Sequence, residues 1–269
     1  MKKKYLSLLM AALLIVMACV TACSSGGGDD GGEAEIPTYV VVTEPTAPPF
    51  DMTDDDGNVI GFDIELLQAI AEDQGFNIEV MTIEFDALIP ALEAGNGDIV
   101  NACTTVTEER ELVVDFCDPY YESSNNLLVK SDNTEITGFE SFTEGCGYKI
   151  AAQMGTECAD EAMQMKEDGL VADVVLLNQT NLCIQQLQNG DVDAVLIDKP
   201  IGQGFIDKTG DELMFVGEPY VGSHCYFAMA VAEGNDELRE KINAGLKNVM
   251  ANGTYDALCE KWGIVGIEH

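Results

Sequence analysis

The sequence predicts an α/β protein of two lobes, each with a sheet that is covered by helices. Strand-like and helix-like segments alternate along most of the chain, which is typical of parallel sheets with helical crossovers. The alternation comes in two successive series, and the folded stretch of about 233 residues exceeds the usual size of one domain. In open α/β sheets, ligands bind at the carboxyl ends of the strands. Polar residues follow the strands of both series, so we expect a ligand site there.

The first 23 residues predict a lipoprotein signal peptide. Lysines at positions 2–4 precede an apolar run, 5–20, which is shorter than the roughly 20 residues of a bilayer span. The run ends in Val-Thr-Ala-Cys, which resembles a lipobox with Cys23 as the lipidated residue. Cys19 is a competitor for this role, and an ordinary signal cleaved near Ala22 is the alternative. We therefore expect the protein to be anchored to the cell membrane by a lipid, facing the extracellular side or the periplasm.

Residues 24–36 and the overall charge limit the kinds of partner that this protein can have. Residues 24–36 are almost entirely Ser, Gly, Asp and Glu, and they predict a flexible tether that reaches roughly 20 Å. The net charge of −35 argues against nucleic acid as a partner and against binding of the folded part to an anionic membrane surface. The same charge favours solubility.

Seven cysteines follow the leader region, and they do not have the spacing of a metal site. No pair is spaced as Cys-x-x-Cys, so we expect no zinc site. We interpret most of them as small apolar core residues, and their pairing stays open. Residues 54–58 lack the pattern of a calcium loop and predict a hairpin turn. We expect no metal and no cofactor.

The first series of elements runs from residue 39 to residue 116. Residues 39–43 favour a strand, and prolines stiffen the loop that follows. Asp63 is a plausible N-cap of a helix that ends at Gly75. The series continues with a strand at 78–83, a helix at 85–92, and strands at 98–102 and 113–116.

The second series begins with a strand at 126–130 and a strand at 148–152. A tight turn at 153–156 leads into a helix that ends near residue 168. Asp198 directly follows the last buried strand of this series. The remaining elements are a strand at 174–177, a helix at 180–188, strands at 192–197, 214–217 and 224–232, and helices at 236–250 and 255–262. The links near 126–131 and 217–223 are predicted hinges.

Arg110 is the candidate for binding an anion. It is one of two arginines in the chain, and it follows a short apolar strand and the hydroxyl of Thr105. A guanidinium binds a carboxylate through two parallel hydrogen bonds, and Thr105 with nearby backbone groups would complete such a clamp. The alternative is that Arg110 caps a loop and pairs with Glu108, Glu109 or Asp115.

An ordered set of short segments carries a resemblance to a known family. The segments are 43–50 (TEPTAPPF), 61–66 (GFDIEL), 86–92 (DALIPAL), 98–99 (DI), 107–110 (TEER), 115–121 (DFCDPYY), 155–156 (GT), 190–195 (GDVDAV), 238–240 (LRE) and 253–255 (GTY). Over residues 39–263 the chain resembles the polar amino-acid-binding proteins of bacterial uptake transporters, which are extracellular solute-binding proteins of family 3, in their lipoprotein form.

The resemblance implies a fold. It is a two-lobed, periplasmic-binding-protein-like clamshell of type II, with the ligand between the lobes. Each lobe would be a mixed, mostly parallel sheet flanked by helices. We expect residues 37–128 and 222–269 to form the first lobe and residues 129–221 to form the second.

The resemblance also implies roles for the polar residues at the strand ends. Arg110 would bind the α-carboxylate of an amino acid, with help from Thr105. Gly155 and Thr156 would donate hydrogen bonds to the same carboxylate from the second lobe. Asp198 would bind the α-ammonium group.

The side chain of the ligand would meet a second set of residues. Phe85 would form one wall of the side-chain slot, and Glu44 would contact a polar end. Ala47 stands where an aromatic residue usually completes the slot. Cys103 lies in a run that replaces small hydroxyl residues, so we expect backbone donors there. Glu157 hints at a cationic or polar ligand side chain, and the alternative is that it complements a helix N-terminus.

Together these expectations predict a monomeric, lipid-anchored receptor. It would capture a free polar or basic L-amino acid and deliver it to the permease of an ABC transporter, without acting as an enzyme. The first alternative is an enzyme on the same clamshell, such as a dehydratase-like protein, for which Glu157 is the only candidate acid or base. The second alternative is a sensory ligand-binding module.

Overall fold

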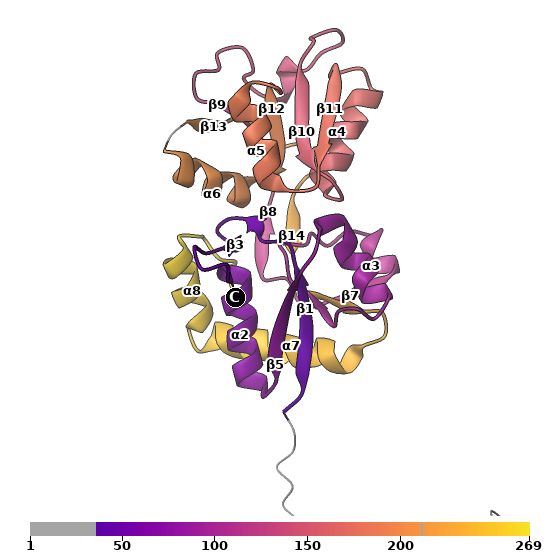
Figure 1. Ribbon diagram of the computed structural model, residues 1–269, viewed down its shortest axis with the longest axis vertical. Helices are drawn as coiled ribbons and strands as arrows, with labels where there is room; N and C mark the ends of the chain where they lie inside the picture. The colour runs from indigo at the N-terminus through magenta and orange to yellow at the C-terminus, as the bar shows by residue number, and fades with distance from the viewer. Residues whose placement is uncertain (1–35, 211) are drawn as a thin grey trace, which may run out of the picture. The chain divides into compact units, whose positions relative to one another are not determined.

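The computed structural model describes residues 36–210 and 212–269. The expected signal peptide, Cys23 and nearly all of the expected tether lie outside these residues. Within them, the chain forms two five-stranded sheets with helices against them, as the α/β prediction requires (Figure 1). Among the described residues, no helix has the length and apolar character needed to cross a membrane.

The first sheet has the strand order β5-β1-β6-β15-β7. Strand β1 pairs in parallel with β5 and β6, whereas β15 pairs antiparallel with β6 and β7. Because the sheet is mixed but mainly parallel, the carboxyl ends of β1, β5 and β6 meet at one edge. The bounds are β1 (Thr38–Thr43), β5 (Asn77–Thr82), β6 (Ile99–Val100), β7 (Val114–Phe116) and β15 (Ala230–Ala232).

The second sheet has the strand order β11-β10-β12-β9-β13. Strand β10 pairs in parallel with β11 and β12, and β9 pairs antiparallel with β12 and β13. The two sheets therefore repeat one topology, with three parallel strands, then an antiparallel strand, then a fifth. The bounds are β9 (Asn125–Lys130), β10 (Lys149–Gln153), β11 (Asp173–Leu177), β12 (Ala194–Asp198) and β13 (Leu213–Val216).

The chain passes between the two sheets at two places. Strand β9 precedes the other strands of its sheet in sequence, and β15 follows all the other strands of its own sheet. A two-stranded antiparallel ribbon of β8 (Tyr121–Ser123) and β14 (Cys225–Phe227) lies directly before β9 and before β15. The expected lobe boundary at 128/129 falls inside β9, whose residues all belong to the second sheet. The chain therefore first passes from one lobe to the other at the ribbon, before β9 begins, and not at the predicted hinge near residues 126–131.

Helices pack against the two sheets and against one another. In the first lobe they are α2 (Phe62–Gln74), α3 (Leu88–Glu93), α7 (Asp236–Ala251) and α8 (Thr254–Trp262). In the second they are α4 (Glu157–Glu167), α5 (Thr180–Asn189) and α6 (Lys199–Thr209). Close approach of α7 to α2 depends on Gly245, where an added Cβ would lie 2.7 Å from the Cγ2 atom of Ile70. Replacing this glycine would force the two helices apart.

The hairpin and cysteine predictions are confirmed. Strands β3 (Asp51–Thr53) and β4 (Val59–Ile60) form an antiparallel pair around the predicted turn. All seven cysteines from Cys103 to Cys259 are free, and every one except Cys146 is buried. They therefore act as small apolar residues in the core.

Two local predictions are wrong. The N-cap of α2 is Gly61, and Asp63 lies inside the first turn, fully buried, where it accepts hydrogen bonds from other segments. The strand expected at 224–232 is divided into β14 and β15, which pair with different strands. Both errors share a cause: partners distant in sequence, rather than local pattern, determine these conformations.

Candidate functional site

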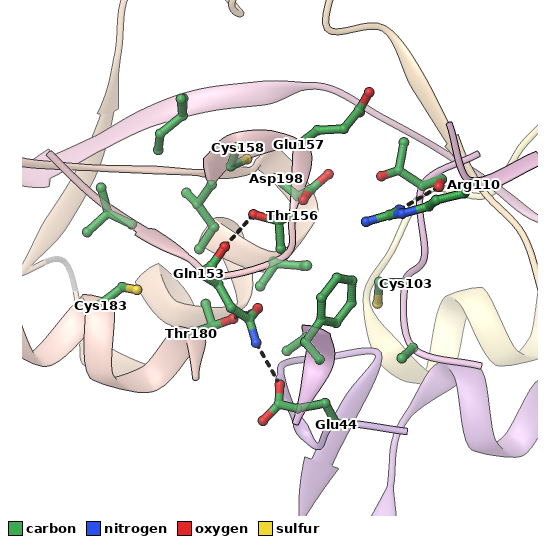
Figure 2. A pocket seen from close by; sticks show the side chains of 18 residues that line it. Glu44, Cys103, Arg110, Gln153, Thr156, Glu157, Cys158, Thr180, Cys183 and Asp198 are labelled. Carbon is green, nitrogen blue, oxygen red and sulfur yellow. Dashed lines mark hydrogen bonds between the residues drawn. The ribbon is translucent and has the colours of Figure 1, made fainter. Parts of the chain in front are cut away.

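A cavity lies at the carboxyl ends of the parallel strands of both sheets (Figure 2). It has about 550 Å³ of atom-free space. Eight of the nine residues predicted to bind a ligand line it: Glu44, Phe85, Cys103, Thr105, Arg110, Thr156, Glu157 and Asp198. Ala47, which stands where the resemblance implies an aromatic residue, also lines it. Residues far apart in sequence therefore meet at one concave site.

Gly155 does not line this cavity. It is exposed in the turn before α4, and its carbonyl oxygen accepts a hydrogen bond of 2.9 Å from Nη2 of Arg110. Gly155 has a φ of +81°, and an added Cβ would lie 2.8 Å from the Cβ of Asp86. A glycine is needed here because the turn comes so close to the segment that begins α3. In this structure Gly155 is thus an acceptor for Arg110, which differs from its predicted role as a ligand donor.

Arg110 lies at the start of a 3₁₀ turn (Arg110–Leu112) beyond β6. Its Nη1 donates a hydrogen bond of 2.6 Å to the carbonyl oxygen of Thr105, and its guanidinium carbon lies 5.7 Å from the centre of the Phe85 ring. Among the residues described, it makes no ion pair, including none with the acids at 108, 109 and 115. Two of its five N–H groups are used by carbonyls, so three remain for a ligand.

Arg110 keeps its positive charge at the cavity wall. Withdrawal from solvent lowers the pKa of Arg110, while the negative charges of Glu157 and Asp198 act in the opposite direction. A half-buried guanidinium of this kind stays charged, because its ordinary pKa is far above neutrality. It therefore offers a positive charge, with free donors, at the wall of the cavity.

Asp198 is the last residue of β12 and supplies a negative charge to the same cavity. Its Oδ1 accepts a hydrogen bond of 2.8 Å from the Ser123 hydroxyl. No hydrogen-bond partner of Oδ2 is found in the described chain, and Figure 2 shows this carboxylate and Arg110 among the residues that line the cavity, with no hydrogen bond drawn between them. Burial raises the pKa of Asp198 to about 6, with the Ser123 hydrogen bond opposing the shift. An uncompensated carboxylate like this favours a cationic partner.

Glu44 follows β1 and lies at another part of the cavity wall. Its Oε2 accepts hydrogen bonds from the Thr46 hydroxyl at 2.7 Å and the Gln153 amide at 3.1 Å. Its Oε1 is buried and has no partner in the described chain. Burial raises the pKa of Glu44, which the Thr46 and Gln153 hydrogen bonds partly offset. The free oxygen is an acceptor that a polar or cationic ligand group could use.

Thr156 is the N-cap of α4, and its hydroxyl is engaged within the protein. The hydroxyl donates a hydrogen bond of 2.7 Å to the Gln153 carbonyl oxygen and accepts one of 3.2 Å from the amide of Ala159. Glu157, the next residue, lies in the first turn of α4, which also suits its alternative role at a helix N-terminus. Burial raises the pKa of Glu157, and the charge of Arg110 lowers it.

Sequence reasoning missed two polar residues and two thiols of the cavity. Gln153 connects both lobes, because its amide nitrogen donates to Glu44 and its amide oxygen accepts from the Thr180 hydroxyl at 2.6 Å. Cys158 and Cys183 also line the cavity. The turn at 153–156 did signal a special site, but nothing in the sequence shows that Gln153 reaches across to Glu44.

Comparisons with known proteins identify a family. Residues 39–265 match the family model described as bacterial extracellular solute-binding proteins, family 3. The L-cystine-binding protein TcyJ of Escherichia coli K12 is 29% identical over 225 residues, which cover 84% of this chain and 82% of that protein. The arginine-binding extracellular protein ArtP of Bacillus subtilis is 30% identical over 215 residues, which cover 80% of this chain and 81% of that protein.

Solved structures give the same fold. An ancestral arginine-binding protein bound to arginine has a TM-score of 0.77 and 37% identity, covering 84% of this chain and 97% of that one. The ancestral amino acid-binding protein AncCDT-1, a precursor of cyclohexadienyl dehydratase, has a TM-score of 0.76 and 32% identity, covering 84% and 95%. The predicted two-lobed architecture is confirmed by these similarities.

Proposed function

Because the chain belongs to the bacterial extracellular solute-binding proteins of family 3, we propose that it captures a free polar or basic L-amino acid for an ABC-type transporter. The observation that carries the proposal is one cavity with two opposite charges on its wall, neither of which forms an ion pair with any residue that the structure describes. Arg110 comes from the first lobe and Asp198 from the second, and they form no ion pair with each other. An amino acid brings a carboxylate for the arginine and an ammonium group for the aspartate.

The energetics of this arrangement suit reversible capture. Each hydrogen bond to a charged group contributes about 1.5–3 kcal/mol. Micromolar binding needs a net free energy of about −8 kcal/mol, so a few such contacts beyond the ordering costs are sufficient. Arg110 and Asp198 are half-buried, and exclusion of water by the bound ligand strengthens both interactions.

Glu44 and Glu157 support the choice of a polar or basic ligand. Both carboxylates line the cavity, and the Oε1 atom of Glu44 has no donor in the described chain. The ammonium or guanidinium of a basic side chain would supply that donor. Phe85 forms an apolar part of the cavity wall next to Arg110, and Ala47 lines the same cavity without supplying an aromatic ring.

The cellular setting is part of the same proposal. Cys23 would carry a lipid that anchors the protein at the outer side of the cell membrane, and the folded part would pass its amino acid to a membrane permease as a monomer. The family consists of extracellular and periplasmic solute-binding proteins, which supports this location.

Substitution of Arg110 tests the binding role. A thermal-shift screen of the common amino acids first identifies the ligand, and calorimetry then measures its affinity for the wild type and for Arg110→Ala. We expect the affinity of Arg110→Ala to fall at least about 100-fold, because two charge-assisted hydrogen bonds are lost. The matched control is Arg239→Ala, since Arg239 pairs with Asp236 on α7 and does not line the cavity. Equal affinities of Arg110→Ala and Arg239→Ala would contradict the proposal.

The same samples separate binding from catalysis. One similar structure is a precursor of a dehydratase, and Glu157, with its raised pKa, is the acid at the cavity that such chemistry would need. We expect the amino acid to be recovered unchanged after long incubation with the protein. A reaction product that the wild type forms and Glu157→Gln does not form would favour an enzyme instead.

A further inference from the structure

Two carboxyl groups, those of Asp51 and Asp63, lie together in the core of the first lobe, next to the ligand cavity. Asp51 begins β3 and Asp63 lies in the first turn of α2, and both are fully buried. Carboxylate oxygens of the two residues lie within 4.8 Å of each other and of the Cys103 sulfur. No lysine or arginine of the described chain pairs with either acid. Two ionised carboxylates so close and so buried would repel each other strongly.

Hydrogen-bond donors reach only one of the two acids. Oδ2 of Asp63 accepts from the Cys103 amide at 2.8 Å and from the Tyr120 hydroxyl at 2.6 Å. Both oxygens of Asp51 and the Oδ1 atom of Asp63 are buried without a partner among the described residues. A proton on Asp51 turns one of its oxygens into a donor for Oδ1 of Asp63, which gives a partner to both groups. Asp63, which already has two donors, is the ionised member.

We propose that Asp51 is a positioning residue of the ligand cavity: it carries a proton that it shares with Asp63, and thereby holds Asp63 as the acceptor that fixes the backbone at Cys103. The positioning role rests on the proposed function, because it assumes that the cavity binds an amino acid. The sharing of the proton does not depend on that function.

The backbone at Cys103 connects the acid pair to the cavity. Cys103 has a φ of +49°, and among the described residues it is the only non-glycine residue with a positive φ. This conformation is unfavourable for a side chain with a Cβ and persists only where the surroundings enforce it. The bond from the Cys103 amide to Asp63 supplies that constraint. Cys103 itself lines the cavity, and the carbonyl of Thr105, two residues later, accepts from Arg110.

The groups around the pair favour a proton on Asp51. Burial raises the pKa of Asp51 well above its ordinary value, and the negative charges of Asp63 and Glu44 raise it further, while the nearby Thr43 hydroxyl acts in the opposite direction. Burial also raises the pKa of Asp63, against the effect of its hydrogen bonds to Tyr120 and Cys103. The pKa values of the Tyr120 hydroxyl and the Cys103 thiol are likewise raised well above their ordinary values by burial, so both keep their protons.

The sign of the pH dependence follows from the raised pKa of Asp51. A group whose pKa is higher in the folded state stabilises that state at low pH, and the contribution is lost as the pH rises through the folded-state pKa. Loss of the shared proton leaves two buried negative charges next to Cys103. Both the stability and the ligand affinity of the wild type should therefore decrease toward alkaline pH.

The test compares the wild type with Asp51→Asn between about pH 5 and 10. The asparagine amide can donate to Asp63 and cannot lose a proton. Thermal unfolding gives the stability, and calorimetry with the amino acid from the screen gives the affinity. We expect Asp51→Asn to match the wild type within about threefold in affinity near neutral pH. At alkaline pH the wild type should lose up to about tenfold in affinity per pH unit relative to Asp51→Asn.

Two controls make the outcome decisive. Asp54→Asn removes a charge from the turn of the same hairpin, where Asp54 is not buried in the core, and it should keep the pH profile of the wild type. Identical unfolding profiles of the wild type and Asp51→Asn would overturn the shared proton. So would a metal ion found by mass spectrometry in equimolar amount whose chelation lowers the unfolding temperature, because a cation would then join the two acids. If neither the wild type nor the two variants bind any amino acid, the proposed function fails. The unfolding profiles alone then decide whether the proton is shared.

Discussion

Asp198 lies in the cavity wall, and its Oδ1 accepts a hydrogen bond of 2.8 Å from the Ser123 hydroxyl and a long one of 4.0 Å from the Cys225 thiol. Burial outweighs the hydrogen bond from the Ser123 hydroxyl, so the pKa of Asp198 in the ligand-free protein rises to about 6. The nearby Glu157 raises the pKa further, and Arg110 lowers it. An α-ammonium group bound to Asp198 would favour the charged form and lower this pKa again.

A pH dependence of binding follows for Asp198. Below about pH 6 the carboxyl group of the free protein is protonated, so the ammonium group loses its partner and affinity falls by up to tenfold per pH unit. Calorimetry between pH 4 and 8, at constant ionic strength, measures this decline. Asp198→Asn should bind weakly at every pH and show no such decline, so parallel profiles for the two proteins would remove Asp198 from the site.

Site residues that directly follow a strand could be predicted from the sequence, whereas those that contact distant segments could not. Arg110 and Asp198 stand directly after strands, and charges at strand ends belong to ligand sites in α/β folds, so both could be placed. Gln153 and Asp63 could not. Gln153 meets Glu44, 109 positions away, and Asp63 meets Cys103, 40 positions away. Local pattern carries no information about such pairs.

At the level of elements, the N-terminus of α4 links helix stability to the cavity. Thr156 caps the helix through the amide of Ala159, and its hydroxyl holds the carbonyl of Gln153. The side chain of Gln153 in turn connects Glu44 with Thr180 at the start of α5. A single hydroxyl thus supports both the first turn of α4 and the position of a cavity amide.

Thr156→Ala tests this link. We expect it to lower the free energy of unfolding by about 1 kcal/mol, because the N-cap is lost, and to weaken ligand binding several-fold, because Gln153 loses its support. Asn235→Ala is the matched control, since Asn235 caps α7 by accepting from Leu238 and does not line the cavity. It should lose similar stability and keep its affinity, as measured by urea unfolding and calorimetry. Thr156→Ser should restore both properties, and equal affinity losses in the two alanine variants would contradict the link.

Elements with a clear hydrophobic periodicity or turn sequence were predicted well, and elements that depend on pairing with distant strands were not. The apolar face of α2 and the hairpin turn at 54–58 follow from spacing and turn residues. The segment 224–232 was predicted to be one strand, and its residues after His224 are continuously apolar. In the structure β14 pairs with β8, whereas β15 pairs with β6 and β7. Continuous apolar character does not reveal that a chain changes sheets.

At the scale of the whole molecule, the two sheets have the same strand order, with one antiparallel strand each. That strand precedes the rest of its sheet in the second lobe and follows it in the first. As a result the chain passes between the lobes twice, and the β8–β14 ribbon accompanies both passages. From these two paired connections we expect one lobe to rotate relative to the other about the ribbon, a motion that would suit the capture and release of a ligand.

The final prediction concerns the attachment of this molecule to the membrane. A lipid on Cys23 would add apolar chains that contribute about 0.8 kcal/mol per buried methylene, enough to hold the protein at the membrane. We expect Cys23→Ser to move from the membrane fraction to the soluble fraction of cells. Its amino-acid affinity should not change, because every residue that lines the cavity lies between Glu44 and Ile201.

Cys19→Ser is the matched control for this experiment, because Cys19 is the other cysteine of the leader region. It should remain in the membrane fraction, since the small residues before Cys23 form the better lipobox. Release of Cys19→Ser together with retention of Cys23→Ser would assign the anchor to Cys19. Retention of both variants would show that neither cysteine is required by itself. The double variant Cys19→Ser/Cys23→Ser would then separate a lipid on either cysteine, which predicts release, from a signal segment that is not removed, which predicts retention.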